Sequence, residues 1–256
     1  MRTDTRRPPK HGVLPALLAG LALASAAWAH EEPTTSPGEE TLTGDWGGAR
    51  STAAKQGYQF EGLARIDAFR NRGALANGSR HVTHLDLKMK VDLEKAAGWD
   101  GANAMVNVLG DGGWGPNAHL VGSQMGVTNV EVAAPTTTRL FQAWLQQSFL
   151  DGRLAVLAGL YPIDTEFYAM ESAAVFLGPQ YGTPADLALT RGPSIFNNSA
   201  FGVRARWAPT KTLYAMGAIL DGIPNDPARP RATAIRFAKG DGSFSIGEAG
   251  WLPEAE

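Results

Sequence analysis

The sequence predicts an all-β fold, an antiparallel transmembrane β-barrel, from three observations. Polar and apolar residues alternate with a period of two along many segments. The connections between these segments alternate between short and longer, as in outer-membrane barrels, where short turns face the periplasm and longer loops face outward. An N-terminal export signal precedes them. A soluble β-sandwich also has alternating strands, but it has no reason to keep this rhythm of connections.

The composition excludes several other classes of protein. The 256 residues include no Cys, and 23 Lys and Arg stand against 25 Asp and Glu. A chain without Cys has neither a disulfide scaffold nor a thiolate metal site. Repeated apolar runs of about 20 residues, which a helical multispanning membrane protein needs, are missing. No basic stripe stands out to neutralise phosphates, so no nucleic-acid partner is expected.

Residues 1–29 have the composition of a cleaved signal peptide. Four basic residues (Arg2, Arg6, Arg7 and Lys10) precede the uncharged stretch Val13–Ala27, and Ala27-Trp28-Ala29 offers small residues at a cleavage site. The alternative, an uncleaved anchor helix, fits less well because the apolar run is short and contains Pro15. The remaining chain keeps 19 basic and 24 acidic residues, a formal charge of −5. It divides into a periplasmic segment, 30–57, and a partial barrel domain, 58–256.

One short helix and about nine strands are expected after the signal peptide. Asp45 can cap a helix that ends at Gly57. In the clearest strand, Val82–Glu94, the odd positions from Leu85 to Leu93 are apolar, while the even positions from His84 to Glu94 are polar or charged. The strands are expected at Tyr58–Asn71, Val82–Glu94, Asn103–Leu109, Leu140–Phe149, Arg153–Tyr161, Phe201–Trp207, Thr212–Leu220, Ala232–Ala238 and Ser243–Trp251.

The lengths of the connections between the expected strands are the second observation that predicts a barrel. The expected short ones are Lys95–Ala102, Leu150–Gly152, Ala208–Lys211 and Lys239–Gly242, and the longer ones are Arg72–His81, Gly110–Arg139, Pro162–Ala200 and Asp221–Arg231. Within the second long connection, Gly110–Gly115 is glycine-rich and is expected to form a flexible external loop. A cation site or an inward constriction is the alternative, but acidic ligands are too few for a calcium loop.

Several motifs resemble those of the carbohydrate-selective porin family (OprB type) of Gram-negative outer membranes. They are Gly44-Asp45-Trp46-Gly47-Gly48-Ala49-Arg50, Asp92-Leu93-Glu94-Lys95 with Gly98-Trp99-Asp100-Gly101, the run Arg139–Phe149, Asp151-Gly152-Arg153-Leu154, Gly182-Thr183-Pro184 and Gly242–Glu248. The resemblance spans Leu42 to Trp251. It implies a sixteen-stranded barrel in the cell outer membrane, monomeric or homo-oligomeric, through which glucose and similar sugars diffuse. It also implies contact with outer-membrane lipid and with the outer-membrane assembly machinery.

The chain departs from the family at its C-terminal end. Family members continue further and finish on an aromatic residue, whereas this sequence stops at Leu252-Pro253-Glu254-Ala255-Glu256. About nine strands cannot close a sixteen-stranded barrel, so we expect a C-terminally truncated chain. A small complete barrel of eight or ten strands is the alternative, although side chains would fill its interior.

If the apolar faces contact lipid, the other faces line a lumen. The charged lumen residues expected on this basis are Arg65, Asp67, Asp86, Lys88, Lys90, Asp92, Arg204 and Arg206. One face of the strand Leu140–Phe149 carries Gln142, Trp144 and Gln146. These residues suit a sugar, because the sugar can stack on the indole while its hydroxyls reach the two amides. Alternatively, Trp144 belongs to an interfacial girdle or packs against an inward loop.

No enzyme activity, cofactor or metal is expected. The sequence has no G-x-S-x-G, P-loop or H-E-x-x-H motif. His81 and His84 would lie on opposite faces of a strand, which does not favour a shared metal. Asp164, Glu166 and Glu171 could supply a glycosidase pair, but nothing fixes their separation. Two hypotheses therefore stand: a passive outer-membrane channel for glucose-like sugars, and a secreted or periplasmic β-rich carbohydrate-binding protein.

Overall fold

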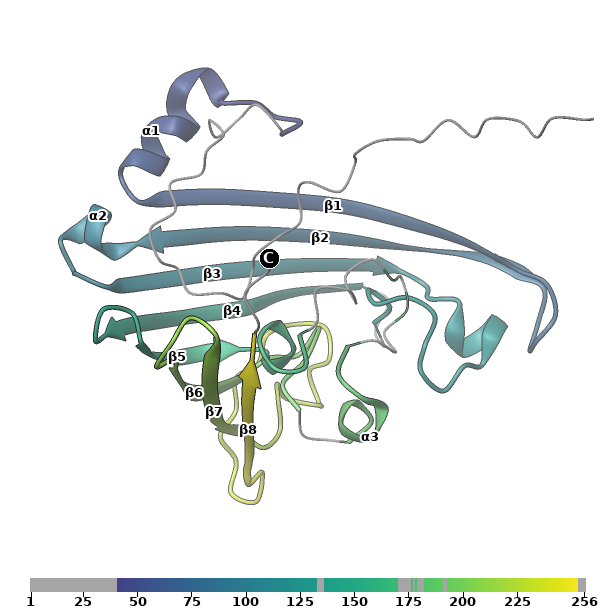
Figure 1. Cartoon of the computed structure of the whole chain (residues 1–256). Coiled ribbons are helices and arrows are strands. Elements are labelled where there is room, and N and C mark those ends of the chain that lie inside the picture. Colours follow the sequence, from purple (N-terminus) through teal and green to yellow (C-terminus); the bar gives the residue numbers. More distant parts are fainter. Residues whose placement is uncertain are drawn as a thin grey trace, which may run out of the picture.

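Eight antiparallel strands form one sheet in the computed structural model, in the same order as in the chain (Figure 1). The structure describes residues 41–132, 136–169, 176, 178, 182–190 and 193–252, so the expected signal peptide lies outside the described residues. The strands are β1 (Tyr58–Asn71), β2 (Gly78–Asp92), β3 (Ala102–Gly113), β4 (Thr136–Phe149), β5 (Leu154–Tyr161), β6 (Ala200–Trp207), β7 (Leu213–Asp221) and β8 (Ser243–Trp251).

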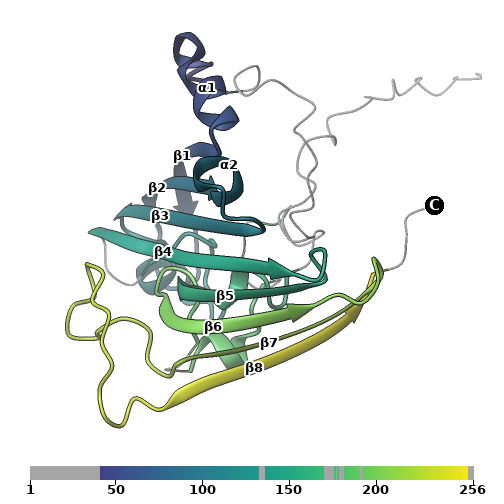
Figure 2. The same cartoon turned by 90° about the vertical axis from the view of Figure 1, so that its left-hand side faces the viewer.

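The sheet is a strongly curved wall. Strands β1 to β4 have 12 to 15 residues each, whereas β5 to β8 have eight or nine. Each strand is rotated relative to its neighbour, so β8 runs steeply across the direction of β1, as Figures 1 and 2 show. Among the described residues β1 and β8 do not pair with each other, and they are the two edges of the sheet.

One end of the sheet, the short-turn end, carries the connections after β2, β4 and β6, and the other end carries the turn after β1 and the long connections after β3, β5 and β7. At the short end, β2 leads into β3 through the helix α2 (Leu93–Ala97), and Leu150–Arg153 and Ala208–Thr212 join the next two pairs. The Asp92 carboxylate caps α2 by accepting hydrogen bonds from the amides of Glu94 and Lys95. The predicted alternation of short and longer connections is present from β3 onward, but the predicted short turn Lys239–Gly242 does not join two strands, because β7 leads directly into β8 through a long connection.

The N-terminal helix lies at the short-turn end, beyond the edge of β1 (Figure 1). The expected helix at Asp45–Gly57 consists of a 3-10 turn, η1 (Trp46–Gly48), followed by α1 (Ala49–Lys55). Asp45 Oδ1 accepts hydrogen bonds from the amide and the hydroxyl of Ser51. Gly57 then joins α1 to β1 with φ +93°, and a Cβ there would lie 2.5 Å from the carbonyl oxygen of Asp92. The close approach explains why glycine occupies this position.

One of the nine expected strands is absent from the described structure. In the segment Ala232–Ala238, only Ala232 forms a β-bridge, to Thr138. The Leu140 amide donates to Thr233 Oγ1 at 2.6 Å, and the Thr138 amide donates to the carbonyl of Arg231 at 3.1 Å. The start of this segment therefore lies beside the first residues of β4, which do not pair with β5. The predicted strand at Ala232–Ala238 was wrong.

A buried apolar cluster lies between strands β5 to β8 and the connection that follows β5. Leu157, Tyr161, Ala200, Met216, Ala218 and Leu220 come from the strands, and Ile163 and Phe167 come from the connection, which begins with the 3-10 turn η3 (Ile163–Thr165). The other short helical elements are the π-helical turn η2 (Asn117–Val121) and α3 (Ala185–Ala188). Among the described residues no helix is long and apolar enough to cross a membrane.

Candidate functional site on the inner face of the sheet

The strand register places all of the expected lumen residues on one face of the sheet. Residues paired across antiparallel strands point to the same side, and Glu61, Lys88, Asn107 and Gln142 form one such row. We call this side the inner face, because the long connections fold over it. It carries Arg65, Asp67, Asp86, Lys88, Lys90, Asp92, Gln142, Trp144, Gln146, Arg204 and Arg206.

The opposite, outer face is apolar and exposed. Its large side chains alternate with those of the inner face and are 38 to 74 % exposed: Ile66, Leu85, Leu87, Val106, Leu145, Val203 and Ile219. An apolar surface that extends over so many strands is unfavourable in water and marks a face that contacts an apolar environment.

Ion pairs of both signs cover the inner face near β1. The Arg65 guanidinium binds Asp67 at 2.7 Å, Lys88 Nζ lies 2.8 Å from Asp86, and Lys90 Nζ lies 2.5 Å from Glu61. These side chains are partly exposed, so they present donors and acceptors to the solvent on this face. Asp92 differs from the others, because its carboxylate caps α2.

The connection between β3 and β4 also contacts this part of the inner face. Arg65 donates to Asn129 Oδ1 at 3.2 Å, and Thr128 Oγ1 donates to Asp67 Oδ2 at 3.3 Å. The same connection contains η2, whose Leu120 carbonyl accepts a hydrogen bond from Asn71. A long connection therefore folds inward over the ends of β1 and β2.

A buried polar cluster is centred on Asp111 of β3. Its carboxylate accepts from His84 Nδ1 at 2.7 Å, from Thr137 Oγ1 at 3.2 Å and from Asn197 Nδ2 at 3.1 Å. Asn197 belongs to the connection between β5 and β6, and its neighbour Phe196 packs edge-on against the ring of His84 at 5.6 Å. Asp111 therefore holds a second long connection against the inner face.

The expectation of a flexible loop at Gly110–Gly115 was wrong for its first four residues. β3 continues to Gly113, where Val82 pairs with it, and Asp111 faces inward. The polar residues Asn103, Asn107 and Asp111 recur every four positions, so they share one face of an extended strand that continues beyond Leu109. That signal could have identified Asp111, but the glycines obscured it. The Asp111–His84–Asn197 cluster was missed.

A second buried cluster surrounds Arg204 of β6, which is only 3 % exposed. Its guanidinium donates through Nε to Glu166 at 2.8 Å, pairs again with Glu166 through Nη2, and reaches Gln146 Oε1 at 2.9 Å. Arg206, two residues along β6, lies over the ring of Tyr214 at 5.3 Å. Arg204 therefore fixes the connection after β5 to the wall, while Arg206 faces the side chains of β7.

The three residues considered for sugar stacking are partly engaged within the protein. Trp144 Nε1 donates to Gln142 Oε1 at 2.9 Å, and Gln146 accepts from Arg204. The Trp144 ring packs against the buried cluster that contains Ile163 and Phe167. This contact matches the alternative in which Trp144 packs against an inward connection.

The two described carboxylates of the three considered for a glycosidase pair, Asp164 and Glu166, hold the structure together. The buried Asp164 carboxyl accepts a hydrogen bond from the Phe196 amide at 2.8 Å, and Glu166 binds Arg204. Burial raises the pKa of Asp164 to about 6, although the hydrogen bond from Phe196 opposes the shift. Glu171 lies outside the described residues. Within the described residues, no group of three or more His, Asp or Glu side chains could hold a metal ion.

Comparison with known proteins identifies relatives of this wall. The model of a family described as "Carbohydrate-selective porin, OprB family" matches residues 76–256. Porin B of Pseudomonas aeruginosa is 29 % identical over 178 residues, which cover 64 % of this chain and 38 % of Porin B. The high-pH structure of OprB from Pseudomonas putida superimposes with a TM-score of 0.72 at 20 % identity, over 88 % of this chain and 55 % of that one.

The chain spans well under two thirds of both proteins: 38 % of the length of Porin B and 55 % of the solved chain. The structural likeness establishes the fold, so the eight-stranded sheet corresponds to part of a porin barrel. The predicted fold class is confirmed.

Proposed function

The chain belongs to the carbohydrate-selective porin family (OprB), and we propose that it forms part of the wall of an outer-membrane channel for the passive diffusion of neutral sugars. The observation that carries the proposal is the division of the sheet into two faces. The outer face is apolar and exposed, and the inner face carries charged and amide side chains in every row of the register.

The chemistry of the inner face suits a neutral, hydroxyl-rich solute. Arginine and lysine donors alternate with carboxylate acceptors, and most of these charges are paired with one another. A sugar hydroxyl both donates and accepts hydrogen bonds, so it can replace hydration at either kind of group. A wall with both signs of charge therefore favours sugars over ions of one sign, and we assign monosaccharides such as glucose as the solute.

The proposed channel needs strands on both sides of the described sheet. In hydrocarbon, an unpaired backbone donor or acceptor costs several kcal/mol, so only closed barrels cross membranes as strands. The free edges of β1 and β8 must therefore pair with further strands. The same requirement opposes the alternative of a soluble carbohydrate-binding protein, which would expose the apolar outer face to water.

The remaining assignments complete the proposal. Residues 1–29 act as a cleaved signal peptide, residues 30–57 lie in the periplasm, and 58–256 belong to the barrel. The short turns then face the periplasm and the long connections face outward. Outer-membrane lipid and the assembly machinery are the expected partners, and a homo-oligomer of barrels is compatible with this arrangement. The channel acts by diffusion without a cofactor.

Liposome swelling tests the proposal. The chain is refolded in detergent, its folding is checked by heat-modifiable gel mobility, and swelling is measured with glucose and with a trisaccharide. Where chains pair their free edges with one another and so close a barrel, we expect swelling with glucose that is faster than with the trisaccharide. A heat-modifiable protein that gives no swelling would contradict an open channel, and a protein that folds in water without detergent would favour the carbohydrate-binding alternative.

A further inference from the structure

We propose that the outer face of the β1–β2 hairpin, at the end of the sheet where the long connections lie, binds phosphate groups of glycolipids in the surrounding membrane. The inference rests on the orientation in the proposed function, which turns this end of the hairpin toward the outer leaflet. It concerns the surface that faces the lipid and not the path of the solute.

The two central side chains are the Arg70 guanidinium of β1 and the His81 imidazole of β2, and both can donate hydrogen bonds. The register pairs Ala68 with His81 and Arg70 with Ser79, so Arg70 and His81 are diagonal neighbours on the outer face. Diagonal neighbours on one face lie about 7 to 8 Å apart, close enough for both side chains to reach one phosphate. Both side chains are exposed.

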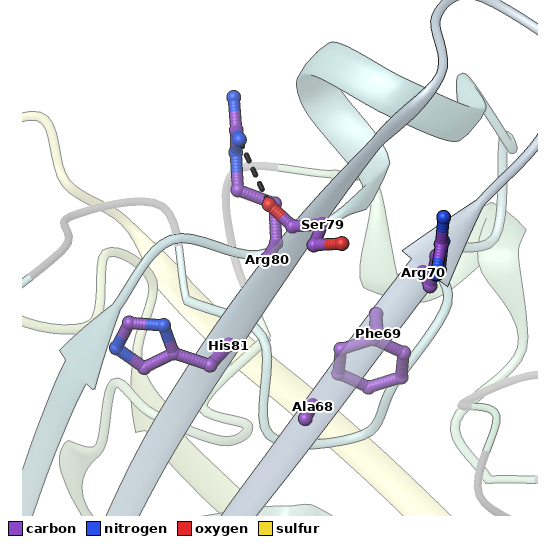
Figure 3. Close-up of a pocket in the computed structure, with 6 residues that line it drawn as sticks. All are labelled: Ala68, Phe69, Arg70, Ser79, Arg80 and His81. Carbon is purple, nitrogen blue, oxygen red and sulfur yellow. Dashed lines mark hydrogen bonds between the residues drawn. The ribbon is translucent and has the colours of Figure 1, made fainter.

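These residues border two hollows that share three residues. The first is lined by Ala68, Arg70, Ser79 and His81 of the outer face and by Phe69 and Arg80, which the register places on the inner face; Figure 3 shows all six on the two neighbouring strands. The second is lined by Ser79, Arg80, His81, Trp114 and His119. Trp114 is 56 % exposed, and its ring lies 6.1 Å from that of His119.

The charge of the patch is uncompensated within the described structure. Neither hollow has an Asp or Glu in its lining. Neither Arg70 on the outer face nor Arg72 in the turn after β1 forms an ion pair with a carboxylate of the described residues. Elsewhere on the hairpin the cations are paired, as with Arg65 and Asp67. A phosphate, which accepts from guanidinium groups in a bidentate manner, is the complementary ligand.

The position of the patch favours a lipid phosphate over a dissolved one. Along the same outer face, Ile66 is 74 % exposed and Leu85 is 42 % exposed, and both belong to the apolar band. Ile66 precedes Arg70 by four residues, a distance of about 13 Å along a strand. The cations and Trp114 therefore lie just beyond the apolar band, at the level of lipid headgroups, where interfacial aromatic residues are enriched.

The test compares two lipids that differ in phosphate. The full chain is refolded in detergent, and its binding of bis-phosphorylated lipid A and of dephosphorylated lipid A in mixed micelles is measured by native mass spectrometry. The variants are Arg70→Gln and the double variant Arg70→Gln with His81→Gln. Arg153→Gln is the matched control, because Arg153 is an exposed cation in the turn at the opposite end of the sheet.

We expect the wild-type chain to prefer the phosphorylated lipid. Arg70→Gln should weaken its binding about fivefold, the worth of one basic residue near an anionic lipid surface, and the double variant should lose the preference. Arg153→Gln should bind as the wild type does. Equal binding of the two lipids by the wild type, or an unchanged preference in the double variant, would overturn the proposal.

Two further measurements separate the possible failures. If inorganic phosphate at millimolar concentration displaces the phosphorylated lipid, the patch is a site for free phosphate and the lipid assignment is wrong. Liposome swelling of the same preparations reports on the channel independently. Swelling without a lipid preference contradicts only this inference, and a lipid preference without swelling contradicts only the proposed channel.

Discussion

Glu166→Ala should make the connection after β5 open from the inner face more often, because it removes the main partner of a buried cation. Arg204 is 3 % exposed and makes its two strongest contacts to Glu166. After the substitution its guanidinium keeps Gln146 Oε1 at 2.9 Å and the Ala155 carbonyl at 3.4 Å. One buried charge would therefore lose its counter-ion while it stays in the wall.

The free-energy cost of Glu166→Ala follows from the burial of Arg204 and Glu166. Breaking a fully buried ion pair by removing one partner costs about 3 to 5 kcal/mol, and an exposed pair costs about 0 to 1 kcal/mol. The Glu166 side chain is 23 % exposed, so the cost lies between the two ranges, close to the buried one. A cost of about 2 to 3 kcal/mol raises the population of the open connection roughly 30- to 160-fold. Ile163 and Phe167 remain buried and keep the connection docked most of the time.

Hydrogen exchange of the amides in 162–169 measures this population. The Ile163 amide donates to the Ser194 carbonyl and the Phe167 amide to the Ile163 carbonyl, so both exchange only when the connection opens. Glu61→Ala is the matched control, because the Glu61 side chain is 45 % exposed where it meets Lys90. If Glu166→Ala speeds this exchange less than threefold, or no more than Glu61→Ala does, the Arg204 contact does not hold the connection and the reasoning is refuted.

Three further predictions follow from the faces and the buried groups. Leu87→Lys should destabilise the membrane-assembled state by about 2 to 4 kcal/mol. Lys88→Leu should leave assembly intact and change sugar flux. Equal heat-modifiable gel mobility of the two variants would contradict the assigned faces. Because the folded state raises the pKa of Asp164 from 3.8 to about 6, folding binds more protons there, so the stability of the protein should fall by about 2 kcal/mol as pH rises from 4 to 6. Asp164→Asn should flatten that dependence in denaturation measured across this range, and an unchanged slope would count against the buried carboxyl. Phe196→Ala removes the ring that packs against His84 and Phe141. The variant should show more open-channel noise in planar-bilayer recordings. Noise no greater than that of the wild type would contradict this prediction.

The alternation of residue types determined the wall and its two faces. Because successive side chains of a strand point to opposite sides, the pattern from Leu85 to Leu93 settles which residues share a face without knowledge of the neighbours. The expected lumen residues Arg65, Lys88 and Arg204 accordingly share the inner face. The capped helix near Asp45 was also predictable, since its signals are local.

The tertiary structure alone decided what covers the inner face. Asp111 meets Asn197, 86 residues later, and Arg204 meets Glu166, 38 residues earlier. The periodicity of the sequence predicts neither contact, because the path of a long connection depends on which buried partners satisfy its polar groups. For the same reason Ala232–Ala238, which alternates like a strand, lies beside β4 with a single bridge. The sequence by itself thus determined the two-faced sheet, through local periodicity, and only the packing of distant segments decided which connections cover its inner face.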